Sequence, residues 1–185
     1  MKNSLVLVLL FAAMSAVPAR AQEESSRFEI YGGYDYVRFN INSNVSGQPP
    51  SQTFNGNGGG GQFIYNVNNW LGVLGDVGGV WATNSTTAGA AIPYLFGPRA
   101  NFGHGMITPF AQVLLGGVAT SSGIVNSGWQ SHFAMTAGGG LDVKVSQHFS
   151  IRPVQAEYFL TKIPDGLNNR QNNFRFSGGV VFRFG

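Results

Sequence analysis

Hydrophobic and polar side chains alternate along residues 174–184, close to the end of the chain. One parity is aromatic, with Phe174, Phe176, Phe182 and Phe184. The other parity carries charged or small side chains, namely Arg175, Ser177, Gly179, Val181 and Arg183. Successive side chains of an extended chain point to opposite faces, so this segment predicts a strand with one apolar face and one polar face. A strand between lipid and a wet interior has this pattern, which favours a membrane barrel.

The same alternation recurs in seven earlier segments. Together with 174–184, it predicts strands over 28–37, 62–67, 70–81, 92–102, 108–119, 132–145 and 149–161. Closing such strands into a barrel leaves no sheet edge, and an open edge could not find hydrogen-bond partners in lipid. We therefore expect an all-β fold, an eight-stranded antiparallel up-and-down transmembrane β-barrel.

The segment 149–161 departs from regular alternation. Arg152 has even parity, whereas Gln155 and Glu157 have odd parity, so a regular strand could not turn all three to one face. Pro153 lies between them and cannot donate a hydrogen bond to a neighbouring strand. One extra residue in a β-bulge at this point would bring all three polar side chains to the interior.

The connections between these strands are expected to alternate in length without exception. The long ones are 41–59, 84–89, 121–130 and 162–172, and the short ones are 66–69, 102–105 and 146–148. Outer-membrane barrels have short periplasmic turns and longer external loops. This pattern predicts that both termini of the barrel lie in the periplasm.

The N-terminal residues have the features of a secretory signal peptide. An apolar run from Leu5 to Ala13 follows Lys2 and precedes the sequence Ala19-Arg20-Ala21. Small residues at these positions fit cleavage after Ala21. The run is shorter than the about 20 apolar residues that a membrane-spanning helix needs. We expect a signal peptide over residues 1–21 and a single outer-membrane β-barrel domain over residues 22–185.

Composition and charge exclude several classes of protein. The chain has 11 basic and 8 acidic residues, and two of the basic ones, Lys2 and Arg20, lie in the expected signal peptide. The remaining charge is nearly balanced, so nothing indicates binding to nucleic acid. Charged residues make up 10% of the chain, against about 25% in a typical soluble domain. The absence of cysteine excludes disulfides and a lipoprotein anchor.

The alternation assigns ten charged side chains to the barrel interior. They are Glu29, Asp35, Asp76, Arg99, Asp142, Lys144, Arg152, Glu157, Arg175 and Arg183. An eight-stranded barrel is just wide enough for side chains to fill it. Because an unpaired buried charge costs several kcal/mol, about 3–5 when its partner is missing, the five acids and five bases should pair. The main interpretation is a structural plug of salt bridges, and a narrow gated pore is the alternative.

By its last strands the chain resembles the small outer-membrane β-barrel family related to the transmembrane domain of OmpA. The resemblance is carried by Gly138-Gly-Gly-Leu-Asp-Val-Lys-Val145, by Ile151-Arg-Pro-Val-Gln-Ala-Glu-Tyr158 and by the aromatic last strand. The chain is similar to barrel-only members, because no peptidoglycan-binding domain follows the barrel. The resemblance implies assembly by a barrel-insertion machinery that recognises a C-terminal aromatic strand. Phe182 and Phe184 would form this signal, although Gly185 follows them.

Several apparent chemical motifs receive a structural interpretation. The stretch 56–61 satisfies the dinucleotide pattern G-x-G-x-x-G, but no helical period follows it, so we expect a flexible loop leading into the second strand. His104 and His148 fall in predicted turns and His132 near the opposite rim, which predicts no metal cluster. His148 and Ser150, with Glu157 downstream, resemble the Ser-His-Glu set of lipid A deacylases. This hydrolase is the less favoured alternative, because Glu157 is assigned to the interior.

These observations predict a non-enzymatic outer-membrane barrel with a packed polar interior and no cofactor. Its expected role is structural or lies in surface interaction, because binding functions concentrate on loops held by a rigid scaffold. The expected partners are outer-membrane lipid and lipopolysaccharide, the barrel-assembly machinery and a surface ligand at the loops. We expect a monomer and no nucleic-acid partner. A soluble secreted barrel is the remaining alternative.

Overall fold

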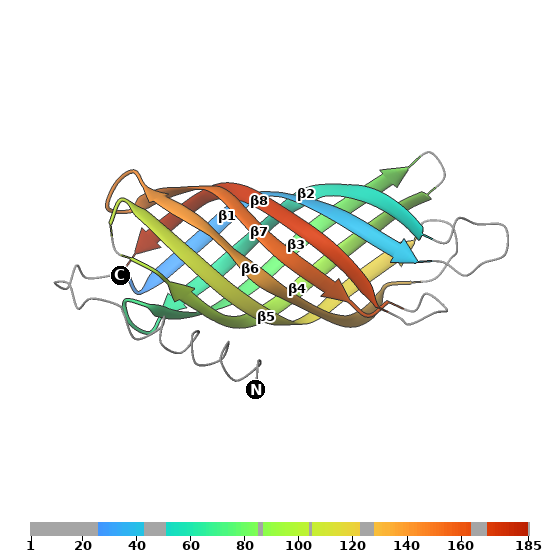
Figure 1. Ribbon diagram of the computed structural model, residues 1–185, viewed down its shortest axis with the longest axis horizontal. Coiled ribbons are helices and arrows are strands. Elements are labelled where there is room, and N and C mark those ends of the chain that lie inside the picture. The colour runs from blue at the N-terminus through green and yellow to red at the C-terminus, as the bar shows by residue number, and fades with distance from the viewer. Residues whose placement is uncertain are drawn as a thin grey trace, which may run out of the picture.

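The computed structural model describes residues 26–42, 51–84, 87–103, 105–122, 128–163 and 170–184. These residues form one closed barrel whose strands tilt across its long axis (Figure 1). The strands are β1 (Phe28–Asn42), β2 (Ser51–Asn66), β3 (Leu71–Asn84), β4 (Thr87–Asn101), β5 (Ile107–Ser122), β6 (Gln130–Lys144), β7 (Phe149–Thr161) and β8 (Gln171–Phe184). None of the described residues forms a helix that is long and apolar enough to cross a membrane.

Every strand pairs antiparallel with its neighbour in sequence, and β8 closes the barrel against β1. Phe28, where β1 begins, lies opposite Phe184, where β8 ends. We call this end of the barrel the terminal end and the opposite one the loop end. The expected eight-stranded up-and-down barrel is therefore confirmed.

The bulge predicted at Pro153 is present in β7. Arg152 pairs with Gly179 of β8, and the next paired residue of β7 is Gln155, opposite Ser177. Three steps along β7 thus match two steps along β8, which inserts one extra residue. As a result Arg152, Gln155 and Glu157 are all buried inside the barrel.

The second strand begins earlier than the sequence suggested. The expected loop over 41–59 was wrong, because β1 continues to Asn42 and β2 begins at Ser51, opposite it. The glycine stretch 56–61 therefore belongs to a strand and is not a flexible loop. Glycine is needed there because a Cβ on Gly58 would overlap the backbone carbonyl of Gly79 on β3. Only a residue without a side chain allows the two strands to approach so closely.

The expected alternation of connection lengths fails at one position. The pairing of β3 with β4 continues to Asn84 and Thr87, so residues 85 and 86 alone connect these strands. The other connections at the loop end span 43–50, 123–129 and 162–170, whereas those at the terminal end span 67–70, 102–106 and 145–148. The polar stretch 84–89 was read as a loop because Asn, Ser, Thr and Gly in succession usually indicate a loop.

The two faces of the strands differ as the alternation predicted. Outward positions expose large hydrophobic side chains, including Phe96 at 65%, Trp81 at 60% and Val77 at 58%. Aromatic side chains gather near the terminal end, where Phe28 contacts Phe63, Tyr65 and Phe184. Such a surface is stable only in apolar surroundings.

Candidate functional site: the charged interior and the outward face

Eight charged side chains are buried inside the barrel, and none of them is more than 7% exposed. They are Glu29, Asp35, Asp76, Arg99, Asp142, Arg152, Glu157 and Arg175. Each comes from a position that the sequence assigned to the interior. The placement of these residues was therefore predictable from the alternation, whereas their pairing was not.

Arg152 is the centre of the first group of charges. Its guanidinium donates to Asp142 at 2.7 Å and 3.2 Å, while Arg99 donates to the same carboxylate at 2.6 Å. The Arg152 guanidinium also lies 4.4 Å from the ring centroids of Tyr31 and Phe110. Arg99 lies 3.8 Å from the Phe110 ring. Aromatic faces attract desolvated cations, so these rings help to hold two arginines around one carboxylate.

Arg175 is the centre of the second group. Its guanidinium lies 2.6 Å from Glu157 and 2.9 Å from Asp76, so one arginine serves two carboxylates. A second nitrogen donates to Asp76 at 3.1 Å, which makes the contact bidentate. Charge-assisted, bidentate pairs of this kind are the strong ones among protein hydrogen bonds.

Two glutamines connect these groups, and sequence reasoning did not assign them this role. The side-chain oxygens of Gln62 and Gln155 each accept from Arg152 at 2.7 Å. The amide nitrogen of Gln62 donates to Asp76 at 2.8 Å, and that of Gln155 donates to Glu157 at 2.9 Å. The first group has one surplus positive charge and the second one surplus negative charge. Each glutamine turns its oxygen to the positive group and its nitrogen to the negative group, so the combined network is electrically balanced.

Three predicted interior residues lie nearer the terminal end. Arg183 donates to Glu29 at 3.3 Å, and Asn66 donates to the same carboxylate at 3.0 Å. Arg183 is 13% exposed, so the Arg183–Glu29 ion pair is more accessible to solvent than the ion pairs of Arg152 and Arg175. Lys144 lies half-buried where β6 ends.

Asp35 lies farther from the terminal end than Glu29, and its carboxylate accepts a hydrogen bond from the Ser177 hydroxyl at 2.5 Å. The expected pairing of five acids with five bases is therefore too simple, because the hydrogen bond to Asp35 comes from a serine.

Part of the interior is apolar, which the expectation of a polar interior missed. One contiguous cluster of buried side chains comprises Val37, Ile64, Leu74, Val80, Ala91, Leu95, Leu114, Val118, Ala134 and Phe159. Most of them come from β3, β4 and β5, on the wall that faces away from Arg152 and Arg175 on β7 and β8. Leu95 and Leu114 share parity with Arg99 and Gln112, so the signal was present in the sequence.

The suggested hydrolytic residues do not form a hydrogen-bonded triad. His148 lies exposed in the turn before β7, Ser150 is fully buried, and its hydroxyl has no hydrogen-bond partner. Glu157 is engaged by Arg175. Among the described residues no group of three His, Asp or Glu side chains could hold a metal ion, and His104 lies outside the described residues.

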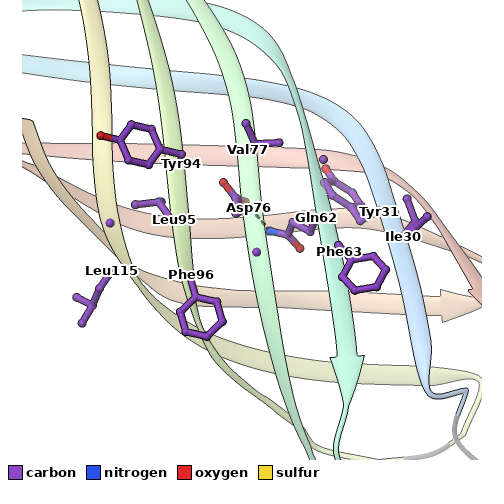
Figure 2. A pocket seen from close by; sticks show the side chains of 13 residues that line it. Ile30, Tyr31, Gln62, Phe63, Asp76, Val77, Tyr94, Leu95, Phe96 and Leu115 are labelled. Atoms are coloured by element: carbon purple, nitrogen blue, oxygen red, sulfur yellow. Dashed lines mark hydrogen bonds between the residues drawn. The ribbon is translucent and has the colours of Figure 1, made fainter. Parts of the chain in front are cut away.

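The outward face carries an open apolar groove of about 660 Å³ that crosses from β1 to β5 (Figure 2). Its walls include Ile30, Phe63, Val77, Tyr94, Phe96 and Leu115. Phe63 and Phe96 stand on β2 and β4, and Gly75 lies opposite both of them on β3 between these strands. Gly61 and Gly75 thus leave the floor of the groove without side chains. We refer to this feature as the outward groove.

The comparisons with known proteins agree with this architecture. The family described as outer membrane protein beta-barrel domain matches residues 7–184, and the chain belongs to this family. Neisserial surface protein A has a similar structure, with a TM-score of 0.67 and 15% identity over 88% of this chain and 100% of that chain. Ail, the attachment invasion locus protein of Yersinia pestis, has a TM-score of 0.56 and 19% identity over 86% of this chain and 99% of that chain. The outer membrane protein OprG of Pseudomonas aeruginosa has a TM-score of 0.57 and 14% identity over 86% of this chain and 96% of that chain. No curated protein matches the sequence.

Proposed function

We propose that this member of the outer membrane β-barrel family is a closed, non-conducting barrel that holds an interaction surface at the exterior of the cell. The observation that carries the closed state is the burial of the interior charges, since Arg99, Arg152 and Arg175 are at most 2% exposed. Side chains that line a water-filled pore would be accessible to water along its length. Eight strands also leave little space beyond that which side chains fill.

The balanced charge network explains why such an interior is stable. Desolvating a charge is costly unless partners and hydrogen bonds compensate for it. Here every central arginine contacts at least one carboxylate, and the two bridging glutamines satisfy donors and acceptors on both sides. The apolar cluster fills the remaining wall and adds a barrier that hydrated ions cross poorly.

The proposed orientation puts the loop end outside and both termini in the periplasm. It is supported by the connections 43–50, 123–129 and 162–170, which are longer than the turns at the terminal end. In this orientation Phe182 and Phe184, both exposed on the last strand, would serve as the assembly signal at the periplasmic side. The barrel would act as a monomer, since closure leaves no sheet edge in the membrane.

The proposed interaction surface includes a two-stranded arm at the loop end. The pairing of β2 with β3 ends at Gly56, whereas β2 continues to pair with β1 up to Ser51. The β3-facing edge of 51–55 therefore lies beyond the ladder and offers backbone groups to an extended partner segment. A surface role is also in keeping with two structural relatives, one named a surface protein and one an attachment invasion locus protein.

Planar-bilayer recording tests the closed state. We expect the reconstituted protein to give no stepwise current, and Arg152→Ala to lower stability without opening a conductance. Large, reproducible current steps from the wild-type protein would overturn the closed barrel in favour of the narrow pore.

Single cysteines test the orientation, because the chain has none of its own. Lys162→Cys should react with an impermeant maleimide on intact cells, whereas His148→Cys should react only after the outer membrane is opened. The reverse pattern would refute the proposed orientation.

A further inference from the structure

The outward groove has the size of a ligand site, because its volume of about 660 Å³ lies within the roughly 300–1,000 Å³ of typical small-molecule pockets. Figure 2 shows its aromatic walls, with Phe63 and Phe96 on opposite sides of β3 and Tyr94 on the same side as Phe96. The outward side chains of the walls are apolar apart from the Tyr94 hydroxyl, whereas Tyr31, Gln62 and Asp76 also border the groove but turn their side chains into the barrel. Such a groove suits a hydrocarbon chain better than a polar ligand.

Glycines near the groove indicate that something outside the chain approaches its wall. Most glycines of the barrel are required by internal packing; for example, a Cβ on Gly97 would overlap the backbone carbonyl of Val113. A Cβ on Gly32 or on Gly75 would meet no atom of the chain within 4 Å. Glycine weakens the interior of a strand and often marks the close approach of a ligand. Internal packing therefore does not explain these two glycines, whereas an external occupant does.

A polar region continues from the groove along β1 and β2 toward the loop end. On β1 the outward side chains after Gly32 are Tyr34, Tyr36 and Arg38, and Asn55 of β2 lies opposite Arg38. The Tyr34 hydroxyl donates a hydrogen bond to the side-chain oxygen of Asn57. These two polar side chains lie between the groove and the guanidinium of Arg38. Arg38 is exposed on the outward face. All five carboxylates of the described residues lie inside the barrel, on the other side of its wall.

The distance between Gly32 at the groove and Arg38 matches the hydrocarbon thickness of one leaflet of a bilayer. Gly32 and Arg38 are separated by six residues of β1, which is about 20 Å along an extended strand. At a strand tilt of about 35–45° this corresponds to about 15 Å along the barrel axis. Half of the hydrocarbon core of a bilayer is also about 15 Å thick. A lipid whose phosphate lies at Arg38 would therefore place the end of its acyl chain at the glycines.

We infer that the outward groove and Arg38 together form a binding site for one anionic membrane lipid of the loop-end leaflet. The end of the acyl chain lies at Gly32, Gly61 and Gly75 between the aromatic walls, and the phosphate pairs with Arg38. The opposite side of the barrel, where Leu141 of β6 and Ile151 and Val154 of β7 are exposed, contacts ordinary mobile lipid. This site depends on the membrane location of the family and not on the closed interior, so the discovery of a conductance would leave it unaffected.

The test uses the folded protein in phosphatidylcholine vesicles that contain spin-labelled phosphatidylglycerol or spin-labelled phosphatidylcholine. We expect the wild-type protein to immobilise phosphatidylglycerol preferentially, by about two- to fivefold, the range that an exposed ion pair provides. Gly75→Leu should abolish the preferential site, because its side chain fills the groove in otherwise open space. Arg38→Gln should remove the preference for phosphatidylglycerol while the immobilised chain remains.

Two matched controls separate this site from general effects on the surface. Ala156→Leu likewise places a leucine on the exposed face of β7, and Lys162→Gln removes an exposed cation at the loop end. Neither should change lipid immobilisation, and the heat-modifiable gel shift should confirm that every variant is folded. Equal effects of the controls, or a wild-type protein without lipid preference, would overturn the inference. Crosslinked dimers that Gly75→Leu abolishes would instead assign the groove to a second copy of the chain, which also overturns it.

Discussion

Replacing Arg175 by methionine would remove the centre of the negatively charged group while keeping a side chain of similar length. Asp76 and Glu157, which are 7% and 2% exposed, would lose their shared cation. Breaking a buried ion pair on one side typically costs about 3–5 kcal/mol. With a urea dependence of about 2 kcal/mol per molar, a loss of about 4 kcal/mol lowers the unfolding midpoint by about 2 M.

Arg183→Met is the matched comparison. Arg183 is 13% exposed and lies 3.3 Å from Glu29, and partly solvated pairs of this kind contribute about 0–1 kcal/mol. Reversible urea unfolding in lipid vesicles, followed by the fluorescence of the three tryptophans and by the gel shift, measures both variants. Adding Glu157→Gln to Arg175→Met should restore more than half of the loss, because the remaining Asp76 carboxylate then balances the surplus positive charge of the Arg152 group. Equal, small losses for Arg175→Met and Arg183→Met would refute the reasoning and show that water solvates the interior charges.

The structure makes four further predictions about five variants, which are measured by the same unfolding assay or by its gel shift. Gly58→Ala should cost about 1–3 kcal/mol through overlap with backbone, whereas Gly75→Ala should gain up to about 1 kcal/mol, because glycine is unfavourable in a strand. Deleting Val154 removes the extra residue of the bulge and should leave a folded gel band at a lower unfolding midpoint, since Arg152 and Gln155 keep their common inward face while Pro153 enters the regular ladder without a donor. Ser150→Ala should raise stability, because it removes a buried hydroxyl without a partner. Gln62→Leu should cost about 1.5–3 kcal/mol, because Arg152 and Asp76 each lose a charge-assisted hydrogen bond.

The alternation of side chains was sufficient to predict the number of strands, their inner and outer faces and the bulge in β7. These features follow from the period of two, which any strand between lipid and a packed interior must obey. The start of β2 was not predictable in this way. Its residues 55–61 are Asn and Gly, which carry no hydrophobic period and usually indicate loops. Their strand conformation depends on contacts with β1 and β3, which are distant in sequence.

The partners of the interior charges were not predictable from the sequence either. Parity places Arg152 and Asp142 on the same face, but it does not place Gln62 of β2 beside Arg152 of β7. That contact depends on the shear of the barrel, which brings distant strands to the same height. The stacking of Arg152 between Tyr31 and Phe110 has the same origin. Long-range register, and not local pattern, therefore determines which charges compensate one another.

The glycines of this barrel have two different roles, and the structure separates them. Glycines with interior parity allow close contact, as at Gly60, where a Cβ would overlap the Asp35 carboxylate. Their loss is expected to disturb the interior or the ladder between strands. Gly32 and Gly75 face outward and have open space above them, so their substitution adds surface without a clash. If the fold required Gly75 as it requires Gly58, alanine would be costly at both positions. A cost for Gly58→Ala and a gain for Gly75→Ala would show that the fold does not require Gly75, as expected if this glycine leaves room for the lipid.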